Sequence, residues 1–519
     1  MGQAVVAGTR GPPSLPVFLL PILLFLTSLA SISIAEHVRS SSSSSSSYSA
    51  HVVQRERRPP PLPILPLPSA SQLSWQLSEM AMFLHFGPNT FTDSEWGTGH
   101  ADPAVFNPEA LDARQWARAA AEAGFSRVVI TAKHHDGFCL WPSAYTDYSV
   151  RSSPWRGGRG DVVGELAAAA REVGIGMGIY LSPWDRHEAS YGKTTEYNEY
   201  YLGQMRELLT GYGEIKEVFL DGAKGENATD MNYLFDCWFR FIHQLQPQAV
   251  IFSDAGPDSR WIGNEAGVAG RTCWSLFNQS AATIGSYLEN ASLIFCSILR
   301  AIGVQVMEIK VGLIGFQQNA MCPSDQDGLI SDEDLQVLQD FSTLRRIIFS
   351  VNFADEAIIT ASSTRGGISD LSFSVAHLLK EGIQTYWAPE EGQCSWGIHL
   401  DLQKPVQFNV LLVQEPIQMG QRIFDFHIDA IVEGEWQTVT YGTTIGYKRL
   451  LKFPMVTSQY LRLVINESRA DPLISYLGIY LDPFLSSHGA FDACTSTSSD
   501  SNRFLQLLSC KSNMDRAAL

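Results

Sequence analysis

Carboxylate and imidazole side chains occur directly after apolar runs in this sequence. Asp221 follows the apolar run Val218–Leu220, and His134 and His135 follow the β-branched run Arg127–Thr131. A carboxylate can act as a nucleophile or a general base, and a neutral imidazole both donates and accepts a hydrogen bond. Together these groups suit a site for a polyhydroxylated ligand, although an aspartate at the end of a strand more often only caps a loop or a helix.

A second carboxyl group would be needed if the chain hydrolysed glycosidic bonds. Glu265 lies in a loop rich in Gly and Asn, close to Trp261. A carboxyl group held against an aromatic ring can have a raised pKa and can serve as a general acid. A solvated loop glutamate fits this pattern about equally well, so the chemistry alone leaves both interpretations open.

Several other chemistries find no support in the sequence. His134 and His135 are adjacent, so on a strand they would point to opposite faces and would rarely bind one metal ion. The sequence contains no HExxH, C-x-x-C or G-x-S-x-G pattern, and we expect neither a metal nor another cofactor. With 37 Lys and Arg against 54 Asp and Glu, the formal charge is −17, which makes nucleic acid or an anionic membrane surface a poor partner.

The elements that must position these residues are predicted to be strands alternating with helices. Helices are expected to begin at the capping residues Asp112 and Asp161 and to end at Gly124 and Gly174. Five βα units of this kind, with no G-x-G-x-x-G after the first strand, favour a (β/α)8-like TIM barrel over an open sheet. The strands are expected at 82–86, 127–131, 177–181, 218–220 and 249–252, and the helices at 112–123, 161–173, about 196–209 and about 230–245.

A barrel of this type carries its active residues at the carboxyl ends of its strands. Unusual polar residues do lie at or just after the carboxyl ends of the expected strands, which a random scatter of polar residues would not produce. They are His85, Lys133, His134, His135, Asp136, Tyr180, Trp184, Asp185, Asp221 and Asp254.

Five segments of the chain together form a highly specific pattern. They are FLHFGPNTFTDSEWGTG (Phe83–Gly99), ITAKHHDGFCLWPS (Ile130–Ser143), MGIYLSPWDRH (Met177–His187), EVFLDGAKGE (Glu217–Glu226) and GPDSRWIGNEAG (Gly256–Gly267). With these segments the chain resembles the α-L-fucosidases of glycoside hydrolase family twenty-nine, in a plant-like form. The resemblance covers about Ser74 to Phe277 and resumes from about Gly328 to Phe484.

The resemblance implies a retaining hydrolase that removes terminal L-fucose in α-1,3 or α-1,4 linkage from fucosylated glycans or oligosaccharides. By this resemblance Asp221 is the nucleophile, and Glu265 matches the acid/base of the subgroup that cleaves those linkages. Fucose carries three ring hydroxyls and an apolar methyl group, so its pocket needs hydrogen-bonding groups and an aromatic wall. The residues assigned to substrate binding are His85, Glu95, Trp96, His134, His135, Tyr180 and Trp261.

Composition divides the chain into five parts. They are a signal peptide (1–35), a low-complexity Ser/Pro leader (36–70), the barrel (71–355), an all-β sandwich (356–484) and a disordered tail (485–519). The apolar run Leu15–Leu29 after Arg10 favours a cleaved signal over a membrane anchor. Cleavage predicts a protein secreted to the extracellular space or apoplast, with no membrane attachment. Four sequons then predict a glycoprotein, at Asn227, Asn278, Asn290 and Asn466.

The C-terminal third changes from helical spacing to alternation. Ser331 is expected to cap the last barrel helix, which continues to about Phe349. Apolar residues then alternate over Ile398–Leu412 and Tyr460–Ile465, which predicts an antiparallel sandwich similar to discoidin or galactose-binding-like modules. A role in packing against the barrel is favoured over independent sugar binding.

The resemblance fails over the segment 286–327, where family members build their late barrel strands. A barrel that lacks strands would expose apolar edges, so the barrel is expected to be incomplete there unless this segment replaces them. The alternative function is therefore a catalytically impaired fucose-binding paralogue. An altered reading frame or a retained intron in the coding sequence would also explain the segment.

Overall fold

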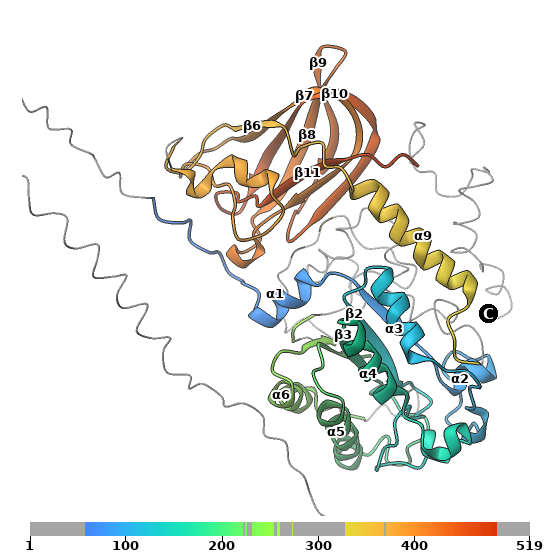
Figure 1. Cartoon of the computed structure of the whole chain (residues 1–519). Helices are drawn as coiled ribbons and strands as arrows, with labels where there is room; N and C mark the ends of the chain where they lie inside the picture. The colour runs from blue at the N-terminus through green and yellow to red at the C-terminus, as the bar shows by residue number, and fades with distance from the viewer. Residues whose placement is uncertain are drawn as a thin grey trace, which may run out of the picture. The chain divides into compact units, whose positions relative to one another are not determined.

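The computed structural model describes residues 58–221, 224–225, 231–253, 257–259, 272, 274, 327–367 and 370–484. Within them lie a parallel sheet covered by helices and an antiparallel sheet (Figure 1). Outside them lie the expected signal peptide, the leader up to residue 57, nearly all of the segment 286–327 and the tail. Among the described helices, none has the length and apolar character needed to cross a membrane.

The first sheet confirms the predicted succession of βα units. Its five strands are all parallel and neighbour one another in chain order, as in one wall of a (β/α) barrel. The strands are β1 (Ala81–Leu84), β2 (Arg127–Lys133), β3 (Gly176–Leu181), β4 (Glu217–Leu220) and β5 (Val250–Ser253). The helices are α1 (Ala70–Leu77), α2 (Pro88–Thr92), α3 (Ala113–Glu122), α4 (Val162–Val173), α5 (Thr194–Gly211), α6 (Phe235–Leu245) and α9 (Asp332–Phe349).

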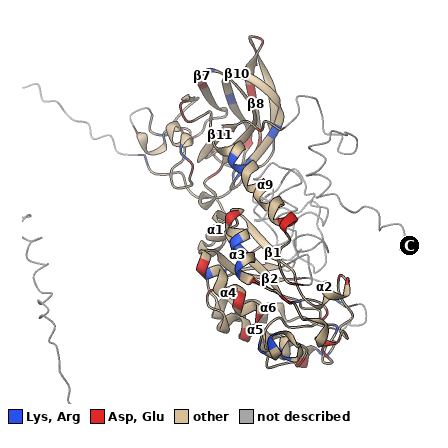
Figure 2. Ribbon diagram, turned by 45° about the vertical axis from the view of Figure 1, so that its right-hand side comes forward, with Lys and Arg blue, Asp and Glu red and all other residues tan. Residues whose placement is uncertain are grey.

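The predicted helix ends are formed by the capping interactions that the sequence indicated. The carboxylates of Asp112 and Asp161 accept hydrogen bonds from backbone N–H groups in the first turns of α3 and α4. Gly174 ends α4 with a left-handed φ of 78°, which a glycine adopts without strain. Ser331 caps α9 by accepting from the N–H of Asp334, and Figure 2 shows acidic residues at the start of this helix and basic residues towards its end. That charge order suits the helix dipole.

The predicted start of the fourth helix is wrong by about one turn. The sequence suggested about 230–245, whereas α6 begins at Phe235. Side chains of α5 bind the backbone just before it: Asn198 donates to the carbonyl of Asn232 and accepts from the N–H of Leu234. These bonds satisfy the backbone groups that a further helical turn would otherwise use.

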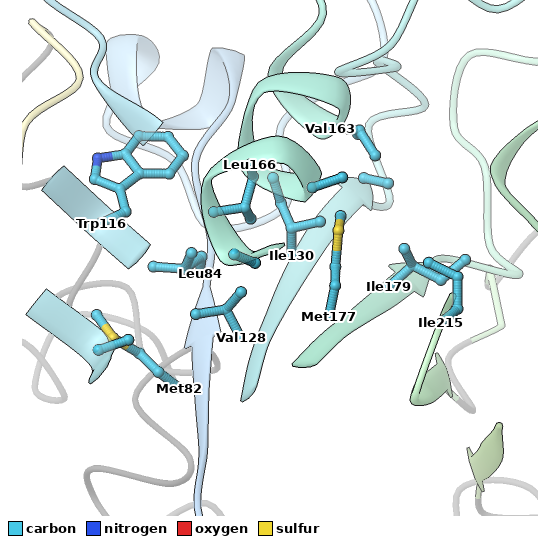
Figure 3. Packing of buried hydrophobic residues seen from close by; sticks show 14 of the residues in the cluster. Met82, Leu84, Trp116, Val128, Ile130, Val163, Leu166, Met177, Ile179 and Ile215 are labelled. Carbon is cyan, nitrogen blue, oxygen red and sulfur yellow. The ribbon is translucent and has the colours of Figure 1, made fainter. Parts of the chain in front are cut away.

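The two faces of the parallel sheet bury different residues. Met82, Leu84, Val128, Ile130, Met177 and Ile179 point to the helices and pack with residues such as Trp116 and Leu166 (Figure 3). The alternate positions point inward and form a second cluster together with Trp75 of α1, and its aromatic strand residues are Phe83, Tyr180, Phe219 and Phe252. Because side chains alternate along a strand, one sheet supplies both the helix-facing core and the filling of the barrel.

Helix α1 closes the amino-terminal end of the sheet. Its Trp75 donates to the carboxylate of Glu217, the first residue of β4, over a distance of 2.6 Å. The same oxygen accepts from Arg127, the first residue of β2, at 2.8 Å, and this ion pair is almost completely buried. A buried polar cluster therefore joins α1 to β2 and β4 at the end of the described sheet opposite the expected active site.

The second sheet is antiparallel, as predicted, with the order β11-β7-β10-β8-β9 and with β6 paired to β7. The strands are β6 (Ile358–Ala361), β7 (Trp396–Gln414), β8 (Ile423–Val432), β9 (Glu435–Gly442), β10 (Arg449–Ser468) and β11 (Tyr476–Tyr480). The two apolar runs within 398–412 belong to the single strand β7. Its pairing with β10 is interrupted around Pro405 and resumes at Val406, but the strand itself continues. Proline has no N–H to donate to the neighbouring strand, so the gap between the two apolar runs marks an interruption in the hydrogen bonding and not the end of a strand.

The barrel and the sandwich share part of one core. Val410, Leu412 and Tyr480 of the sandwich belong to the same buried cluster as the helix-facing residues of the barrel. Tyr447 and Lys448 also bind the carboxylate of Glu79, just before β1. These contacts agree with the expectation that the sandwich packs against the barrel.

The last part of the proline-rich leader is extended and lies on the sandwich. Arginine side chains of the sandwich donate to three of its carbonyl groups: Arg365 to Pro59, Arg422 to Leu62 and Arg469 to Leu65. The N–H of Ile64 donates to the carbonyl of Met419 at 3.1 Å. Residues 59–65 thus form part of the folded domain.

Glu415 joins three backbone segments of the sandwich. Its fully buried carboxylate accepts from the N–H groups of Arg422, Ile423 and Gly446 at 2.7, 3.0 and 2.7 Å. Burial raises its pKa to about 7. At pH 8, Glu415→Gln is expected to lower the free energy of unfolding by about 1–3 kcal/mol, because the amide nitrogen of glutamine faces an N–H group that needs an acceptor.

Urea unfolding of the two proteins measures this loss. Glu435→Gln, at an exposed position of β9, is the matched control and should leave the stability unchanged. Equal unfolding midpoints for Glu415→Gln and the wild type would show that the three bonds do not stabilise the sandwich.

Candidate active site

The predicted site residues gather at the carboxyl ends of the first four strands. His85 directly follows β1 and Asp221 directly follows β4. His134 and His135 follow β2, and Tyr180 is the penultimate residue of β3. Because parallel strands end on the same edge of a sheet, their side chains converge there.

Asp221 lies at the centre of this group. The hydroxyl of Tyr180 donates to its Oδ2 at 2.9 Å, and the Nε2 of His135 lies 3.7 Å from the same oxygen. The Asp221 side chain is 22% exposed, so a ligand can reach it. Burial and the neighbouring Asp221 raise the pKa of Tyr180 well above its usual value, so its hydroxyl remains a donor to the carboxylate at every physiological pH.

The three histidine rings are in contact beside Asp221: His134 stacks on His135, and His85 meets His134 edge to face. The ring centroids of His85 and His134 are 4.5 Å apart, and those of His134 and His135 are 4.2 Å apart. Burial lowers the pKa of His85 to about 4 and also lowers the pKa values of His134 and His135. All three imidazoles are therefore neutral near pH 7, and each can donate one hydrogen bond and accept another, as the sequence reasoning required.

The hydrogen bonds of Ser182 assign the tautomer of His135. Ser182 donates its single hydroxyl hydrogen to the carbonyl of Trp184, and its oxygen lies 2.7 Å from the Nδ1 of His135. Nδ1 must then carry the ring proton and donate it to Ser182. The Nε2 atom of the neutral ring is consequently an acceptor on the side of Asp221.

Aromatic side chains border the site on one side. The ring centroid of Trp96, which is 48% exposed, lies 6.4 Å from that of His135 and 6.0 Å from that of Trp184. Trp184 itself lies 4.9 Å from His135. Glu95 precedes Trp96 in an exposed loop, and Asn89 donates to its backbone carbonyl. Trp184 is not among the predicted substrate-binding residues, although its position just after β3 is a signal in the sequence that indicates this place.

A fully buried ion pair lies beneath this region. The ammonium of Lys133 is 2.8 Å from Asp185 and 2.9 Å from the amide oxygen of Gln204. The other oxygen of Asp185 accepts from the N–H groups of His187 and Glu188. The pair thus connects the end of β2 with the loop after β3.

Asp136 is a second buried carboxyl group near the site, and burial raises its pKa to about 7. Among the described residues, its Oδ2 has no hydrogen-bonding partner. An unfolded aspartate has a pKa of about 3.9, so between about pH 4 and pH 7 the folded state binds a proton that the unfolded state has lost. The stability that Asp136 contributes is present at low pH and is lost as the pH rises through this range.

Asp136→Asn is expected to abolish this pH dependence, because the amide stays neutral. The difference in unfolding free energy, variant minus wild type, should therefore increase between pH 4 and pH 7, by at most about 1.4 kcal/mol per pH unit. Urea unfolding at pH 5, 6, 7 and 8 measures the difference. Asp340→Asn, at an exposed position on α9, is the control, and parallel stability curves for Asp136→Asn and the wild type would contradict the prediction.

Three predicted residues, Glu265, Trp261 and Asp254, lie outside the described residues. Within the described ranges, no group of three His, Cys, Asp or Glu side chains is arranged to hold a metal ion.

Comparison with known proteins decides the family. Residues 70–265 match the sequence profile of the α-L-fucosidases. Alpha-L-fucosidase 1 of Arabidopsis thaliana is 56% identical over 460 residues, which is 83% of this chain and 90% of that protein. A rice relative whose name also designates an α-L-fucosidase is 58% identical over 453 residues, 82% of this chain and 87% of the relative. The chain belongs to the α-L-fucosidase family.

Solved structures agree with this assignment for the fucosidase. A Ruminococcus gnavus family twenty-nine (GH29) fucosidase in complex with fucose superposes with a TM-score of 0.71 at 29% identity, covering 82% of this chain and 97% of that one. The members of this family are glycoside hydrolases, so the fucosidase is an enzyme. High identity over most of the chain favours this reading over the impaired fucose-binding paralogue.

Proposed function

We propose that the fucosidase hydrolyses terminal α-linked L-fucose with retention of configuration, by a double displacement. Asp221 is the nucleophile, and Glu265 is the acid/base. The observation that supports this most directly is the placement of Asp221, whose Oδ2 is held by Tyr180 among three neutral imidazoles. The fucose bound by the Ruminococcus gnavus relative supports the choice of sugar.

The two steps exchange one bond each at the anomeric carbon. In the first, a carboxylate oxygen of Asp221 bonds to this carbon while the glycosidic C–O bond breaks, and the departing oxygen takes the proton of Glu265. In the second, Glu265 removes a proton from water, whose oxygen bonds to the same carbon and displaces Asp221. Tyr180 stabilises Asp221 as a carboxylate, the form that attacks and the form that leaves.

The neutral imidazoles and the aromatic border supply the recognition. The hydroxyl groups of fucose can each donate to one ring nitrogen and accept from another, and Nε2 of His135 is already assigned as an acceptor. Trp96 offers a flat apolar surface to the sugar, and Glu95, His85, His134 and Trp261 complete the proposed set. By resemblance the substrates are fucosylated glycans or oligosaccharides with α-1,3 or α-1,4 linkages.

Two measurements test the mechanism. Proton NMR of the first product released from an aryl α-L-fucoside should show the α-anomer, which then mutarotates. A fucosyl fluoride that carries fluorine at C2 should form a slowly hydrolysed ester, and mass spectrometry of the digested protein should locate it on Asp221. Release of the β-anomer, or a label on another carboxylate, would exclude the proposal.

We also propose that the fucosidase is secreted to the apoplast and glycosylated. The apolar run after Arg10 and the four sequons support this. Asn466 is the sequon residue within the described range, and it is exposed on β10. Expression in plant cells should place the protein in the extracellular fluid, and deglycosylated peptides should show conversion of Asn466 to Asp. Retention inside the cells would contradict the proposal.

A further inference from the structure

Two loops at the site are in contact backbone to backbone. The pocket loop (residues 93–100) carries Glu95 and Trp96, and the strap (residues 185–188) follows β3. A Cβ atom at Gly99 would lie 2.6 Å from the carbonyl group of Arg186, and Gly99 has a φ of +77°. Both facts require glycine at this position, since any side chain would push the loops apart.

Arg186 connects the strap to the pocket loop at a second point. Its Nη1 donates to the carbonyl of Gly97, directly after Trp96, and its guanidinium lies 5.4 Å above the ring of Trp184. Its backbone N–H donates to the carbonyl of His135 at 2.8 Å. One residue therefore contacts the backbone beside two proposed substrate-binding residues.

His187 forms a third connection. Its Nδ1 lies 2.6 Å from the carbonyl oxygen of Gly99, which can only accept, so Nδ1 carries the proton. The ring stacks on Tyr148 with centroids 3.9 Å apart and an interplanar angle of 12°. This stacking fixes the imidazole in the orientation that the hydrogen bond needs.

The strap is itself fixed to the sheet. Asp185 accepts from the N–H groups of His187 and Glu188 at 2.9 Å each, and Lys133 at the end of β2 binds its other oxygen. Because Lys133 and Asp185 are fully buried, this end of the connection is anchored in the core.

We propose that Arg186 and His187 are positioning residues, which hold the pocket loop so that Trp96 stays beside His135 before the sugar binds. This inference rests on the proposed role of Glu95 and Trp96 in the fucose pocket. Without the connections, the loop would populate several arrangements and substrate binding would have to select one. If the competent arrangement is populated one tenth of the time, the apparent affinity falls about tenfold. The chemistry at Asp221 should change little.

Hydrogen exchange and kinetics together test the inference. Arg186→Ala should speed amide exchange in peptides that cover 93–100 and should raise KM for an aryl α-L-fucoside about tenfold, with kcat within about twofold of the wild type. Arg186→Lys can still donate to Gly97 and should recover most of the KM. His187→Ala should act in the same direction. Arg206→Ala, which removes an arginine packed on Phe241 of α6, is the matched control and should change neither quantity.

Two outcomes for Arg186→Ala would overturn the inference: unchanged exchange in residues 93–100, or faster exchange with an unchanged KM. Trp96→Ala separates this failure from a failure of the proposed pocket. If Trp96→Ala raises KM and Arg186→Ala does not, the pocket assignment stands and only the positioning role falls. If Trp96→Ala leaves KM unchanged, both the pocket assignment and the positioning role are wrong.

Discussion

Asp221→Asn is expected to lower kcat/KM for an aryl α-L-fucoside by at least about 1,000-fold, the scale of loss that follows removal of a catalytic nucleophile. Asparagine has the same shape as aspartate, and its oxygen can still accept from the hydroxyl of Tyr180. The side chain is partly exposed and follows the strand rather than filling the core, so the melting temperature should stay close to that of the wild type. Initial rates and thermal unfolding measure the two effects.

A small external nucleophile tests directly whether Asp221 is the group that attacks the anomeric carbon. In Asp221→Gly, azide should enter the space of the carboxylate, attack the anomeric carbon and displace the aryl group, which gives a β-fucosyl azide. Asp236→Asn, at an exposed position in the first turn of α6, is the control and should keep full activity. Near-normal turnover by Asp221→Asn would remove Asp221 from the role of nucleophile, and failure to form the azide product would leave its role as the attacking group without support.

Local signals account for most of the described barrel. Asp112, Asp161 and Ser331 cap helices as their side-chain chemistry indicates, and Gly174 ends α4 in the left-handed conformation. The strands are found where apolar residues gather between helical patterns, and their parallel order follows from the alternation. These features depend on interactions within a few residues of each other, which a single sequence records.

Features that depend on contacts between distant segments were not predictable. The start of α6 is set by Asn198 on the preceding helix, and no pattern near residue 230 indicates that. Arginines of the sandwich bind the extended leader segment through its backbone carbonyl groups. Because every residue has such a carbonyl, the sequence of the leader does not indicate these contacts.

In the candidate site, too, local features were predictable and contacts between distant segments were not. The convergence of His85, His134, His135, Tyr180 and Asp221 follows from their positions at strand ends, and the structure brings them together. The contacts of Arg186 with Gly97 and of His187 with Gly99 join two loops through carbonyl groups, and no sequence pattern predicts them. Sequence reasoning therefore finds the groups that do chemistry more readily than the groups that hold them.

Lys133→Met is expected to lower the free energy of unfolding by about 3–5 kcal/mol, because it leaves the carboxylate of Asp185 buried without its charged partner. The sequence placed Lys133 among the polar residues at a strand end, whereas the structure buries it completely, 2.8 Å from Asp185 and 5.2 Å from the centre of the Tyr200 ring. Methionine fills much of the same volume, so the loss comes mainly from charge rather than from a cavity. Urea unfolding measures it.

A second substitution distinguishes charge from packing. Asp185→Asn keeps an oxygen that accepts from the N–H groups of His187 and Glu188, but it removes the negative charge. The double variant Lys133→Met, Asp185→Asn should therefore be more stable than Lys133→Met alone, since no unpaired charge remains buried. If the double variant is no more stable, the loss in Lys133→Met reflects packing. If Lys133→Met is within about 1 kcal/mol of the wild type, the buried pair does not stabilise the strap on which the pocket loop rests.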